Sequence, residues 1–504
     1  MAQKRGVKKG SSSTKVVQRR PFLDPTPEAV RAFIDAIPFY AQDTEDPTFW
    51  PDERLRDRQD ELLRRQMGWL AEASPHYRGV FERESVDIAG VKTVDDLVNL
   101  PVTTKKDLMS DPQSFRMKFT QGTLYDLTYA TVYTTGTTMG WPTPYEYTTH
   151  DFFGVLQAGI RNAKLSYYIP GDLFLTGFPL SPLPHVAGFG NLIANAAQVG
   201  FLHGFTGIPH DEFPIQRSSA ALVGTVESQR PPILAGIGSF LRRMFADAAE
   251  SGRDLSSLEI VIASGEVLTK GMRDHMHANL ARCGADQVFI TGTYGFTEGG
   301  LPWAPCYEGG PLHPAAPDQV FLEILDPDTH QRVPDGQPGL VALTHLNRRG
   351  MPLLRYLLGD VSAITHERCD RCGRGGGSLL VSTGSAHITR TSELLKIKGT
   401  LVNPQMIHDV VMNTPGIVEY QMIVTLEDLA DPYSQEKIVL RLGLEPAVDR
   451  AAWEGKELEG LTGKLLRAAE MRPHVEIVDD LSTIYDPGRE FKARRIIDER
   501  PKAD

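Results

Sequence analysis

The stretch Thr291-Gly292-Thr293-Tyr294-Gly295-Phe296-Thr297-Glu298 follows an apolar run, Gln287–Thr291, that has the composition of a buried strand. Around it, residues 171–345 alternate short β-rich runs with amphipathic stretches, which is typical of a parallel sheet covered by helices. Such sheets bind ligands beyond the carboxyl ends of their strands. Tyr294 would then offer a flat face to a base, Thr297 a hydroxyl to a phosphate, and Glu298 a hard oxygen to Mg²⁺. An ordinary strand-to-helix turn is the alternative interpretation.

The same periodicity predicts the neighbouring elements. A hairpin is expected over residues 320–346, because two Pro/Asp/Gly clusters separate its apolar runs. Residues 22–108 are expected to be mostly helical, with one helix over Arg54–Ala73. The other expected strands are Leu173–Phe178, Ile233–Gly236, Leu258–Ser264 and Leu340–Leu346, and the expected helices include Phe240–Glu250 and Lys270–Arg282.

A second unit begins after about residue 388. Residues 404–413 and 451–470 are predicted to be helical, and residues 417–425 and 436–443 to be strands. The predicted architecture is therefore an α/β large N-terminal domain, residues 21–389, with a small α+β C-terminal domain, residues 390–504.

Composition excludes several classes of protein. The 504 residues contain 53 Lys plus Arg against 64 Asp plus Glu, a net charge of −11, so a general nucleic-acid binder is not expected. Residues 1–20 carry seven basic residues and no acidic one, which predicts a disordered, solvated tail; a transit peptide or an anionic-surface contact is the alternative. No apolar run reaches about 18 residues, so no membrane span is expected. Four cysteines form no disulfide framework, and a cytoplasmic location is predicted.

Three further segments have the chemistry of a nucleotide site. The loop Tyr133–Gly140 combines hydroxyls and glycines that would cradle phosphate oxygens, although Trp141 stands where a Walker lysine would be. Asp360 follows Gly359, where a carboxylate would accept both hydroxyls of a ribose. Lys492 would neutralise charge that develops at a phosphoester. The alternatives are a polar turn, a surface aspartate and a solvated basic face. The candidate loop residues are Thr134, Thr135, Gly136, Thr137 and Thr138.

Cysteine spacing predicts a metal site. Cys369 and Cys372 form a C-x-x-C pair whose two thiolates can reach one tetrahedral ion, and Cys306 and His313 supply a second half-site. Four protein ligands leave no open position, so the expected ion is structural Zn²⁺. A redox pair is the alternative to a metal site, and Cys283 or His366 would be the alternative fourth ligand.

The order of these segments resembles the adenylate-forming superfamily of acyl-CoA synthetases and adenylation domains, in particular its phenylacetate–CoA ligase-like branch. Ser74–Arg78, Leu100–Leu108 and Asp498–Arg500 are similar to signatures of that branch, and the resemblance runs from about Arg64 to Arg500. Members of the branch often carry a Cys…His plus C-x-C or C-x-x-C zinc site in this region, which supports the Zn²⁺ prediction.

The resemblance implies a role for each candidate. Thr134 to Gly140 would bind the β- and γ-phosphates of ATP, Thr297 the α-phosphate, and Asp360 the ribose. Tyr294 would stack on adenine, Glu298 would hold Mg²⁺, and Lys492 would be the adenylation lysine. The strand-end residues beside adenine would be Ser264, Gly265 and Glu266; the domain-junction arginine would be Arg390; and the acyl pocket would be lined by His185, Phe189, Ile237 and Tyr294.

The implied function is ATP-dependent activation of a carboxylic acid, expected to be aromatic, to an acyl-adenylate, followed by transfer to coenzyme A after the small domain rotates. Two alternatives stay open: transfer to an amine or a carrier-protein thiol, and a catalytically inactive zinc-containing interaction protein. A homodimer is a candidate assembly. The sequence departs from the family at four places: an extra residue near Met139, no lysine after the loop glycine, Ser392 or Glu393 at the hinge aspartate, and Phe491 for glycine.

Overall fold

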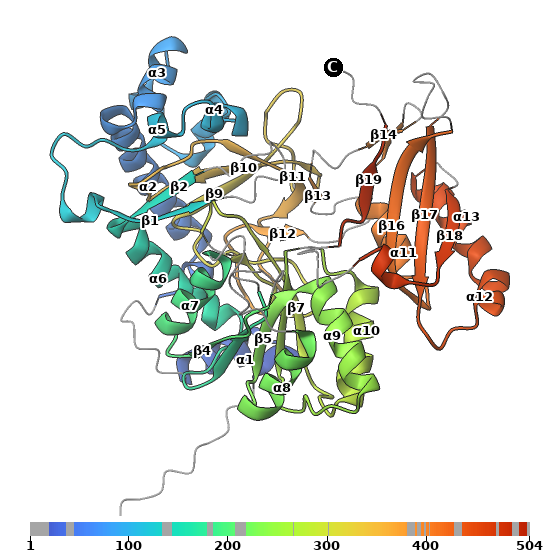
Figure 1. The fold of residues 1–504 in the computed structure, drawn as a ribbon. Helices are drawn as coiled ribbons and strands as arrows, with labels where there is room; N and C mark the ends of the chain where they lie inside the picture. Colours follow the sequence, from blue (N-terminus) through green and yellow to red (C-terminus); the bar gives the residue numbers. More distant parts are fainter. Residues whose placement is uncertain are drawn as a thin grey trace, which may run out of the picture.

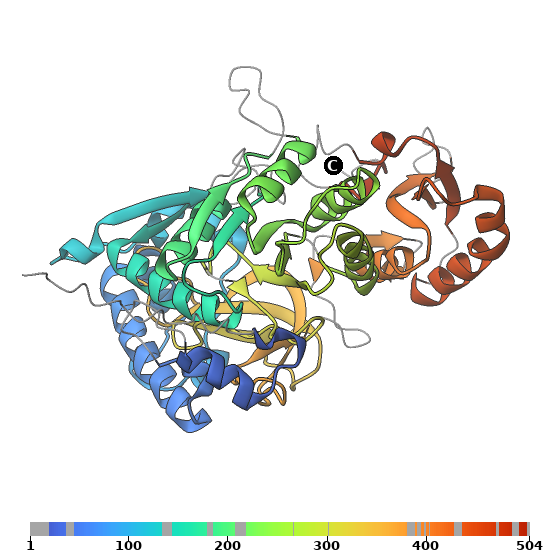
Figure 2. The same ribbon diagram turned by 90° about the horizontal axis from the view of Figure 1, so that it is seen from below.

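The computed structural model (Figure 1) describes residues 20–36, 45–133, 144–178, 185–206, 218–265, 267–300, 302–380, 389–390, 395–397, 400–402, 404–427, 436–469, 473–485 and 493–500. The perpendicular views of Figures 1 and 2 both show a large domain with a smaller C-terminal domain against one side of it. The predicted division into a large α/β domain and a small α+β domain agrees with this arrangement.

A largely parallel sheet forms the centre of the large domain. Its strands lie in the order β4-β3-β5-β6-β7-β8, and only the β7–β8 pair among them is antiparallel. β5 is buried along its whole length, because helices cover both faces of the sheet. The bounds are β3 Leu173–Thr176, β4 Gly200–His203, β5 Ile233–Ile237, β6 Ile260–Ser264, β7 Phe289–Gly295, β8 Pro302–Trp303, α6 Thr149–Leu165, α7 His185–Ala196, α8 Ser219–Gln229, α9 Gly238–Glu250 and α10 Lys270–Arg282.

A second, antiparallel sheet packs beside the first. β9 Val320–Leu325 and β10 Gly339–His345 form the predicted hairpin, with Leu340 opposite Leu325 and His345 opposite Val320. β10 then pairs with β11, which continues the sheet to its remaining strands. β1 and β2 form a separate antiparallel ribbon. The remaining bounds are β11 Tyr356–Thr365, β12 Ser378–Leu380, β13 Thr389–Arg390, β1 Thr128–Tyr133 and β2 Pro144–Thr148.

The N-terminal part is helical, as predicted. The expected helix Arg54–Ala73 is α2, Asp52–Ala73, which buries Leu62, Leu63, Met67 and Leu70. The short helix α4 begins after Thr104 in a capping box, in which the Asp107 carboxylate accepts the Thr104 N–H at 2.8 Å and the Asp107 N–H donates to Thr104 Oγ1. The other helices are α1 Pro27–Ala36, α3 Pro75–Arg83, α4 Lys105–Ser110 and α5 Pro112–Phe115.

The C-terminal domain is a mixed sheet with helices on one side. Its strands lie in the order β18-β17-β16-β19, where β16 and β17 are antiparallel and the two outer pairs are parallel. The helix predicted over residues 451–470 is two helices, because the chain breaks at Glu457 between α12 and α13. The bounds are β14 Leu395–Ile397, β15 Thr400–Val402, α11 Pro404–Met412, β16 Ile417–Leu426, β17 Glu436–Leu444, α12 Arg450–Lys456, α13 Leu458–Ala469, β18 His474–Val478 and β19 Ile496–Asp498.

The two domains meet where α9 and α10 face α11 and β16. Met272 and Met276 of α10 share a hydrophobic cluster with Val411 and Met412 of α11. The backbone N–H of Gly271 donates to Asn413 Oδ1 at 2.7 Å, and a Cβ atom at this position would clash with the Met412 carbonyl. A glycine is therefore required for this close approach.

Arg20, the last residue of the predicted tail, is buried instead. Its guanidinium donates to both Asp172 oxygens at 3.1–3.2 Å, to Glu259 Oε2 at 2.7 Å and to the Tyr167 carbonyl at 2.5 Å. These groups lie before β3 and before β6, so Arg20 attaches the N-terminal segment to the amino ends of the parallel strands. Residues 1–19 lie outside the described residues.

The predicted core elements match closely, with one difference that affects the site. The helix predicted over Lys270–Arg282 is α10 with the same bounds, and the strand predicted over Leu258–Ser264 begins two residues later. The strand predicted to end at Thr291 runs on to Gly295. Tyr294 therefore belongs to a strand, where its backbone is fixed by pairing with Trp303, and not to a turn. Among the described residues, no helix is long and apolar enough to cross a membrane.

The carboxylate of Glu323 is expected to be critical for stability. Its side chain is fully buried between Arg332, at 2.9 Å, and Arg355, at 3.4 Å, and the Arg355 side chain is only 2% exposed. Glu323→Gln should lower the free energy of unfolding by about 3–5 kcal/mol, because it leaves a buried guanidinium without its counter-charge. Urea unfolding followed by tryptophan fluorescence measures this free energy. Glu61→Gln, at an exposed pair with Arg58, should change the free energy of unfolding little. Equal losses in the Glu323 and Glu61 variants would contradict the prediction.

Candidate functional site

The carboxyl ends of three parallel strands bring predicted site residues together. The strand register places Ile237 of β5 beside Ser264 of β6, and Ser264 beside Thr293 of β7. Thr293 Oγ1 donates to Ser264 Oγ at 2.9 Å, and Ser264 Oγ donates to the Thr293 carbonyl at 3.3 Å. Gly265 follows with φ +86°, a left-handed conformation that turns the chain away from the sheet.

Tyr294 and Asp360 connect the two sheets at this edge. The Tyr294 hydroxyl, at the end of β7, donates to Asp360 Oδ2, in β11, at 2.7 Å. Asp360 is 7% exposed, and its backbone pairs with that of Arg390 in β13. The predicted base-stacking and ribose-binding residues, 66 positions apart in the sequence, are thus in direct contact.

Glu298 lies in the same region as a buried carboxyl group. Its Oε1 accepts a hydrogen bond from the Tyr356 hydroxyl at 3.4 Å. Burial raises the pKa of Glu298 above its usual range, and the nearby Asp360 raises it further, whereas Lys105 and Tyr356 act in the opposite direction. A carboxylate at this position therefore favours a positive charge beside it.

Lys105 is a site residue that the sequence motifs did not assign. It is the first residue of α4, and its charge acts on Glu298. The neighbouring backbone is fixed to the second sheet, because the Thr103 N–H donates to the Arg355 carbonyl at 3.0 Å and the Leu357 N–H donates to the Thr103 carbonyl at 2.9 Å. The sequence indicated this region only through the resemblance of Leu100–Leu108 to a family signature. No local sequence pattern predicts that α4 lies near the end of β7.

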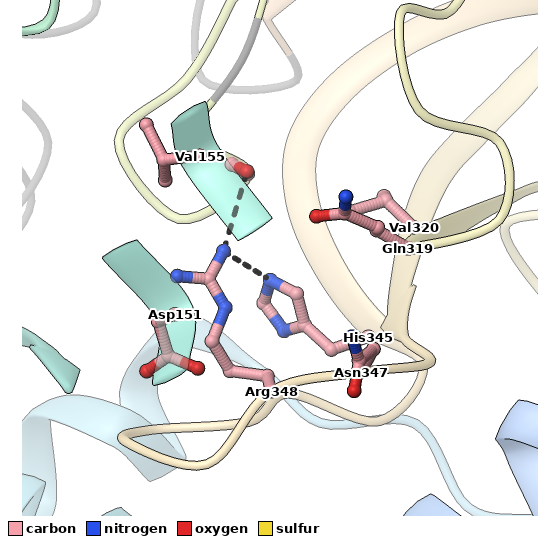
Figure 3. A pocket seen from close by; sticks show the side chains of 8 residues that line it. Asp151, Val155, Gln319, Val320, His345, Asn347 and Arg348 are labelled. Atoms are coloured by element: carbon pink, nitrogen blue, oxygen red, sulfur yellow. Dashed lines mark hydrogen bonds between the residues drawn. The ribbon is translucent and has the colours of Figure 1, made fainter. Parts of the chain in front are cut away.

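A buried polar network holds the turn that carries Thr297 and Glu298. The Tyr147 hydroxyl donates to the Thr297 carbonyl at 2.6 Å, and Arg348 Nη2 donates to the Gly299 carbonyl at 3.3 Å. His345 Nδ1 accepts the Leu353 N–H at 2.9 Å, so Nε2 carries the proton and donates to the Glu298 carbonyl at 3.0 Å. Figure 3 shows His345 and Arg348 at a cavity of about 10 Å³, the size of one water molecule.

One acyl-pocket candidate contacts this network, and a second lies at the carboxyl end of β5. The Phe189 ring of α7 contacts the Tyr147 ring edge-on, with centroids 5.5 Å apart, and Ile237 is buried at the end of β5. His185 begins α7. Several predicted residues fall outside the described residues, namely Thr134, Thr135, Gly136, Thr137, Thr138, Glu266 and Lys492, and for His185 and Arg390 only the backbone is described.

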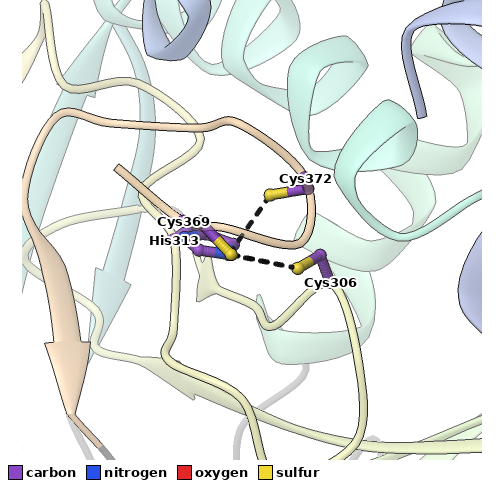
Figure 4. A group of neighbouring side chains, drawn as sticks. All are labelled: Cys306, His313, Cys369 and Cys372. Atoms are coloured by element: carbon purple, nitrogen blue, oxygen red, sulfur yellow. Dashed lines mark hydrogen bonds between the residues drawn. The ribbon is translucent and has the colours of Figure 1, made fainter. Parts of the chain in front are cut away.

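The predicted metal ligands form one cluster. The ligand atoms of Cys306, His313, Cys369 and Cys372 all lie within 4.8 Å of one another, and Figure 4 shows their side chains converging. Cys306 Sγ is 3.8 Å from Cys369 Sγ, and His313 Nε2 is 3.4 Å and 3.5 Å from the sulfurs of Cys306 and Cys372. Zn–S and Zn–N bonds of about 2.3 and 2.0 Å in a tetrahedron place ligand atoms about 3.5–3.8 Å apart. The donor set and its spacing therefore fit zinc.

The surroundings of the cluster fit the same ion. His313 Nδ1 lies 2.8 Å from Ser378 Oγ, a partner that leaves Nε2 free to face the sulfurs. Hydrogen bonding from Cys306 lowers the pKa of the Cys372 thiol and so favours a thiolate there. The Arg374 side chain is 1% exposed, and its two terminal nitrogens have no hydrogen-bond partner in the described part of the chain. The guanidinium also lies 3.7 Å from the Asp46 carboxylate, so it would offset part of the negative charge of three thiolates bound to one Zn²⁺.

Comparisons with known proteins agree with this geometry. Residues 128–345 match the family described as AMP-binding enzyme. The phenylacetate-coenzyme A ligase of Thermus thermophilus is 26% identical over 467 residues, which cover 89% of this chain and 98% of the relative. The corresponding ligase of Aromatoleum evansii is 24% identical, with 89% and 96% covered. A crystal structure of 2-hydroxyisobutyryl-CoA ligase in the postadenylation state has a TM-score of 0.74 at 21% identity, covering 90% of this chain and 91% of that one; in the thioesterification state the TM-score is 0.58.

The match of residues 128–345 to the AMP-binding enzyme family, together with the similarity to acid–coenzyme A ligases, supports an adenylate-forming enzyme. The similarity to phenylacetate-coenzyme A ligases extends over nearly the whole length of the chain, and the structure has the fold of 2-hydroxyisobutyryl-CoA ligase.

Protonation of His345 should make the enzyme less stable in acid. Burial, assisted by the charge of Arg348, holds the pKa of His345 well below its usual value of 6.5. The unfolded chain therefore takes up a proton near pH 6.5 that the folded chain does not. The free energy of unfolding should fall by about 1.4 kcal/mol for each pH unit below 6.5, until the pH reaches the pKa of His345 in the folded protein.

The measurement is urea unfolding between pH 7 and pH 5. His345→Gln removes the titrating group and should flatten the pH dependence by that amount. His474→Gln, at a side chain that is 59% exposed, should leave the dependence unchanged. An unaltered slope in the His345 variant would show that this residue is not buried as a neutral ring.

Proposed function

We propose that the enzyme activates a carboxylic acid with ATP and passes the acyl group to coenzyme A. The contact between Tyr294 and Asp360, beside the buried Glu298, is the observation that carries this proposal. An aromatic ring that would stack on a base, a carboxylate that would accept ribose hydroxyls and a carboxylate that would hold a cation thus lie along one edge of the molecule, which supports the proposal. The postadenylation state of the structural relative, an acyl-AMP complex, has the same fold.

Activation is needed because a carboxylate is a poor electrophile, whose leaving group would be oxide. Attack of the carboxylate oxygen on the α-phosphorus of ATP forms the acyl-adenylate and releases pyrophosphate. The thiol of coenzyme A then attacks the acyl carbon, and AMP leaves. In the first step the α-phosphorus exchanges its bond to pyrophosphate for a bond to the carboxylate oxygen. In the second step the acyl carbon exchanges its bond to the AMP oxygen for a bond to sulfur, and the thiol proton is released. Neither step needs an oxidant or a reductant.

Glu298 is the residue that we assign to Mg²⁺. Its carboxyl group is buried, and its raised pKa means that a cation beside it would be strongly favoured. When bound, the ion would neutralise charge on the phosphates. His345 and Tyr147 keep the Thr297–Glu298 backbone in place by their hydrogen bonds to its carbonyls, so the carboxylate needs no rearrangement to bind the cation.

Two lysines would supply further positive charge. Lys492 is assigned to the adenylation step from its position in the sequence. Lys105 is assigned to the phosphate side of Glu298, because residues 134–143 contain no cationic residue. Thr297 would contact the α-phosphate, and the loop Thr134–Thr138 would contact the outer phosphates.

The acid is expected to be aromatic. Phe189, Tyr147 and Ile237 give the region beside the nucleotide edge an apolar character, which suits an aryl group. The curated relatives named phenylacetate-coenzyme A ligase act on an aryl acid. Product analysis must distinguish coenzyme A from two other acyl acceptors, an amine and a carrier-protein thiol.

Pyrophosphate exchange and product analysis test this function. The enzyme should catalyse acid-dependent exchange of pyrophosphate into ATP with aryl acids, and should form AMP and an acyl thioester when coenzyme A is added. Lys492→Ala should slow exchange by about 100-fold or more, because one charge that stabilises the transferring phosphoryl group is lost. Thioester formation from supplied acyl-AMP should change far less.

The control is Lys464→Ala, at an exposed lysine of α13 in the same domain, which should leave both rates unchanged. Equal losses in both half-reactions of the Lys492 variant would contradict the assignment of that residue. Absence of exchange across aryl, fatty and amino acids would contradict the function itself.

We propose Zn²⁺ as the ion of the Cys306, His313, Cys369 and Cys372 cluster. With four protein ligands it has no open position for a reacting water, so its role is structural. The ligands come from the segment after β8 and from the loop between β11 and β12, and the ion would hold these two segments together.

The purified protein should contain about one zinc per chain by elemental analysis. Cys372→Ser should lose most of the metal and unfold at a lower temperature, and chelation should lower the unfolding temperature of the parent protein in the same way. Cys283→Ser, at a buried cysteine outside the cluster, should retain the metal. Full zinc content in the Cys372 variant would rule out this ligand set.

A further inference from the structure

The largest group of exposed apolar side chains lies on the β1 ribbon. Within the described residues, eight large hydrophobic side chains are exposed, and six of them belong to one region. We call this region the apolar edge; it consists of Leu124, Tyr125, Leu127, Tyr129 and Tyr133, in and before β1, and Phe153 of α6. A cluster of this kind marks an interaction surface more often than scattered apolar residues do.

The apolar edge is organised and not a loose loop. The Tyr129 ring stacks on the Phe152 ring with centroids 4.3 Å apart, and Tyr125 contacts Phe153 at 6.3 Å. The Leu127 carbonyl accepts the Thr149 N–H at 2.9 Å, which fixes the start of β1 to α6. The exposed rings are therefore held in place before any partner binds, which lowers the entropy lost on association.

The strand itself has an unpaired side. β1 pairs with β2 on one side, and no other described strand pairs with it. An unpaired strand side offers backbone N–H and C=O groups to another strand. The pairing of β1 with β2 is irregular at Tyr129 and regular from Ala130 to Tyr133. Over the regular part the residues alternate in orientation: Val132 is buried, whereas Thr131 and Tyr133 are exposed, and Tyr129 before them is exposed too. A partner strand would therefore meet two aromatic rings on one face.

Charge favours a second copy of the same chain as the partner. Residues 119–133 contain a single ionisable carboxylate or base, Asp126, which is already paired with Arg349 at 2.5 Å. The chain as a whole carries a net charge of −11, so two copies repel each other over most of their surfaces. At the apolar edge this repulsion is smallest, and the same surface can face itself.

The exposed area and the position of the apolar edge agree with a second copy of the chain as the partner. The six side chains are each 48–79% exposed, which amounts to on the order of 600 Å² for residues of this size. That approaches the roughly 800 Å² per partner of a standard interface before any backbone or polar neighbour is included. Figures 1 and 2 both show β1 on the side of the large domain away from the C-terminal domain, so a partner here leaves that domain unobstructed.

We propose that two copies of the chain form a twofold dimer by antiparallel pairing of their β1 strands. With the twofold axis at Thr131, Tyr129 of each copy faces Tyr133 of the other, and the two ribbons become one continuous sheet. Antiparallel pairing of a strand with its own copy is symmetric by construction, which is the commonest arrangement of homodimers. Aromatic cross-strand pairs of this kind stabilise such sheets.

Light scattering and sedimentation of the full chain test the dimer. At micromolar concentration the mass should be twice 55.7 kDa. The double variant Leu127→Glu, Tyr129→Glu should weaken association by about 30-fold or more, since it buries unpaired carboxylates in the interface, one of them opposite Tyr133 of the other copy. Leu466→Glu, at an exposed leucine of α13 outside the apolar edge, should remain dimeric. Circular dichroism and the unfolding temperature check that each variant is folded.

A cysteine at the proposed axis tests the register. Thr131→Cys should form a disulfide between two copies under mild oxidation, because directly opposed residues of antiparallel strands lie within disulfide range. Ser251→Cys, at an exposed position after α9, should not. A monomer at all concentrations up to about 100 µM, far above the dissociation constants of standard interfaces, would overturn the proposal. So would a double variant that stays dimeric, or a Thr131 variant that does not cross-link. Flotation of a monomer with lipid vesicles would overturn it too, by assigning the surface to a membrane.

Discussion

The hydrogen bond from the Tyr294 hydroxyl to Asp360 is the contact on which the site depends, because it joins two sheets that have no strand in common. Each sheet alone presents half of the proposed nucleotide site: an aromatic ring from β7, a carboxylate from β11. A separation of 66 residues is bridged at 2.7 Å only because β9, β10 and β11 pair in sequence and bring β11 to the carboxyl edge of the parallel sheet. Around this bond, burial and Asp360 raise the pKa of Glu298 and Lys105 offsets only part of this effect, so a cation bound beside the Glu298 carboxylate would be stabilised.

Sequence patterns predicted most of the elements, and their limits have physical reasons. Helix α10 and strand β6 were predicted within two residues, because buried apolar runs and helical spacing are local signals. The length of β7 was not predicted, because Gly292 and Gly295 have low strand propensity and are held in the strand by pairing with Ala263 and Pro302. The order of motifs predicted Tyr294, Asp360 and Glu298 as neighbours. His345, Arg348 and Lys105 were missed, since their roles arise from contacts with backbone carbonyls or charges far away in the sequence.

The metal cluster lies on the segments that follow two strands of the same edge, β8 and β11. Cys306 follows the short strand β8, which pairs with Tyr294 and Gly295, and Trp303 of β8 stacks on Phe296 with centroids 5.4 Å apart. Cys369 and Cys372 follow β11, the strand that carries Asp360. An ion that joins these segments would therefore fix the chain after β8, which pairs with Tyr294, and after β11, which carries Asp360. The cluster and the proposed nucleotide site are connected through these two strands.

Glu419 has two cationic neighbours, one in each domain. Arg495 of the small domain contacts its two oxygens at 2.8 and 3.1 Å, and Arg242 of α9 contacts Oε2 at 3.5 Å. If the small domain swings away, Glu419 leaves together with Arg495 and stays neutralised, whereas Arg242, now 3% exposed, is released to solvent on the large domain. The energetic cost of the swing then includes the loss of the Arg242–Glu419 contact and the exposure of the apolar cluster that joins α10 to α11, and hydration of the guanidinium offsets only part of it. Dissolved anions that associate with the released guanidinium would accelerate such a motion, so the rate of turnover would depend on the anion present in the buffer.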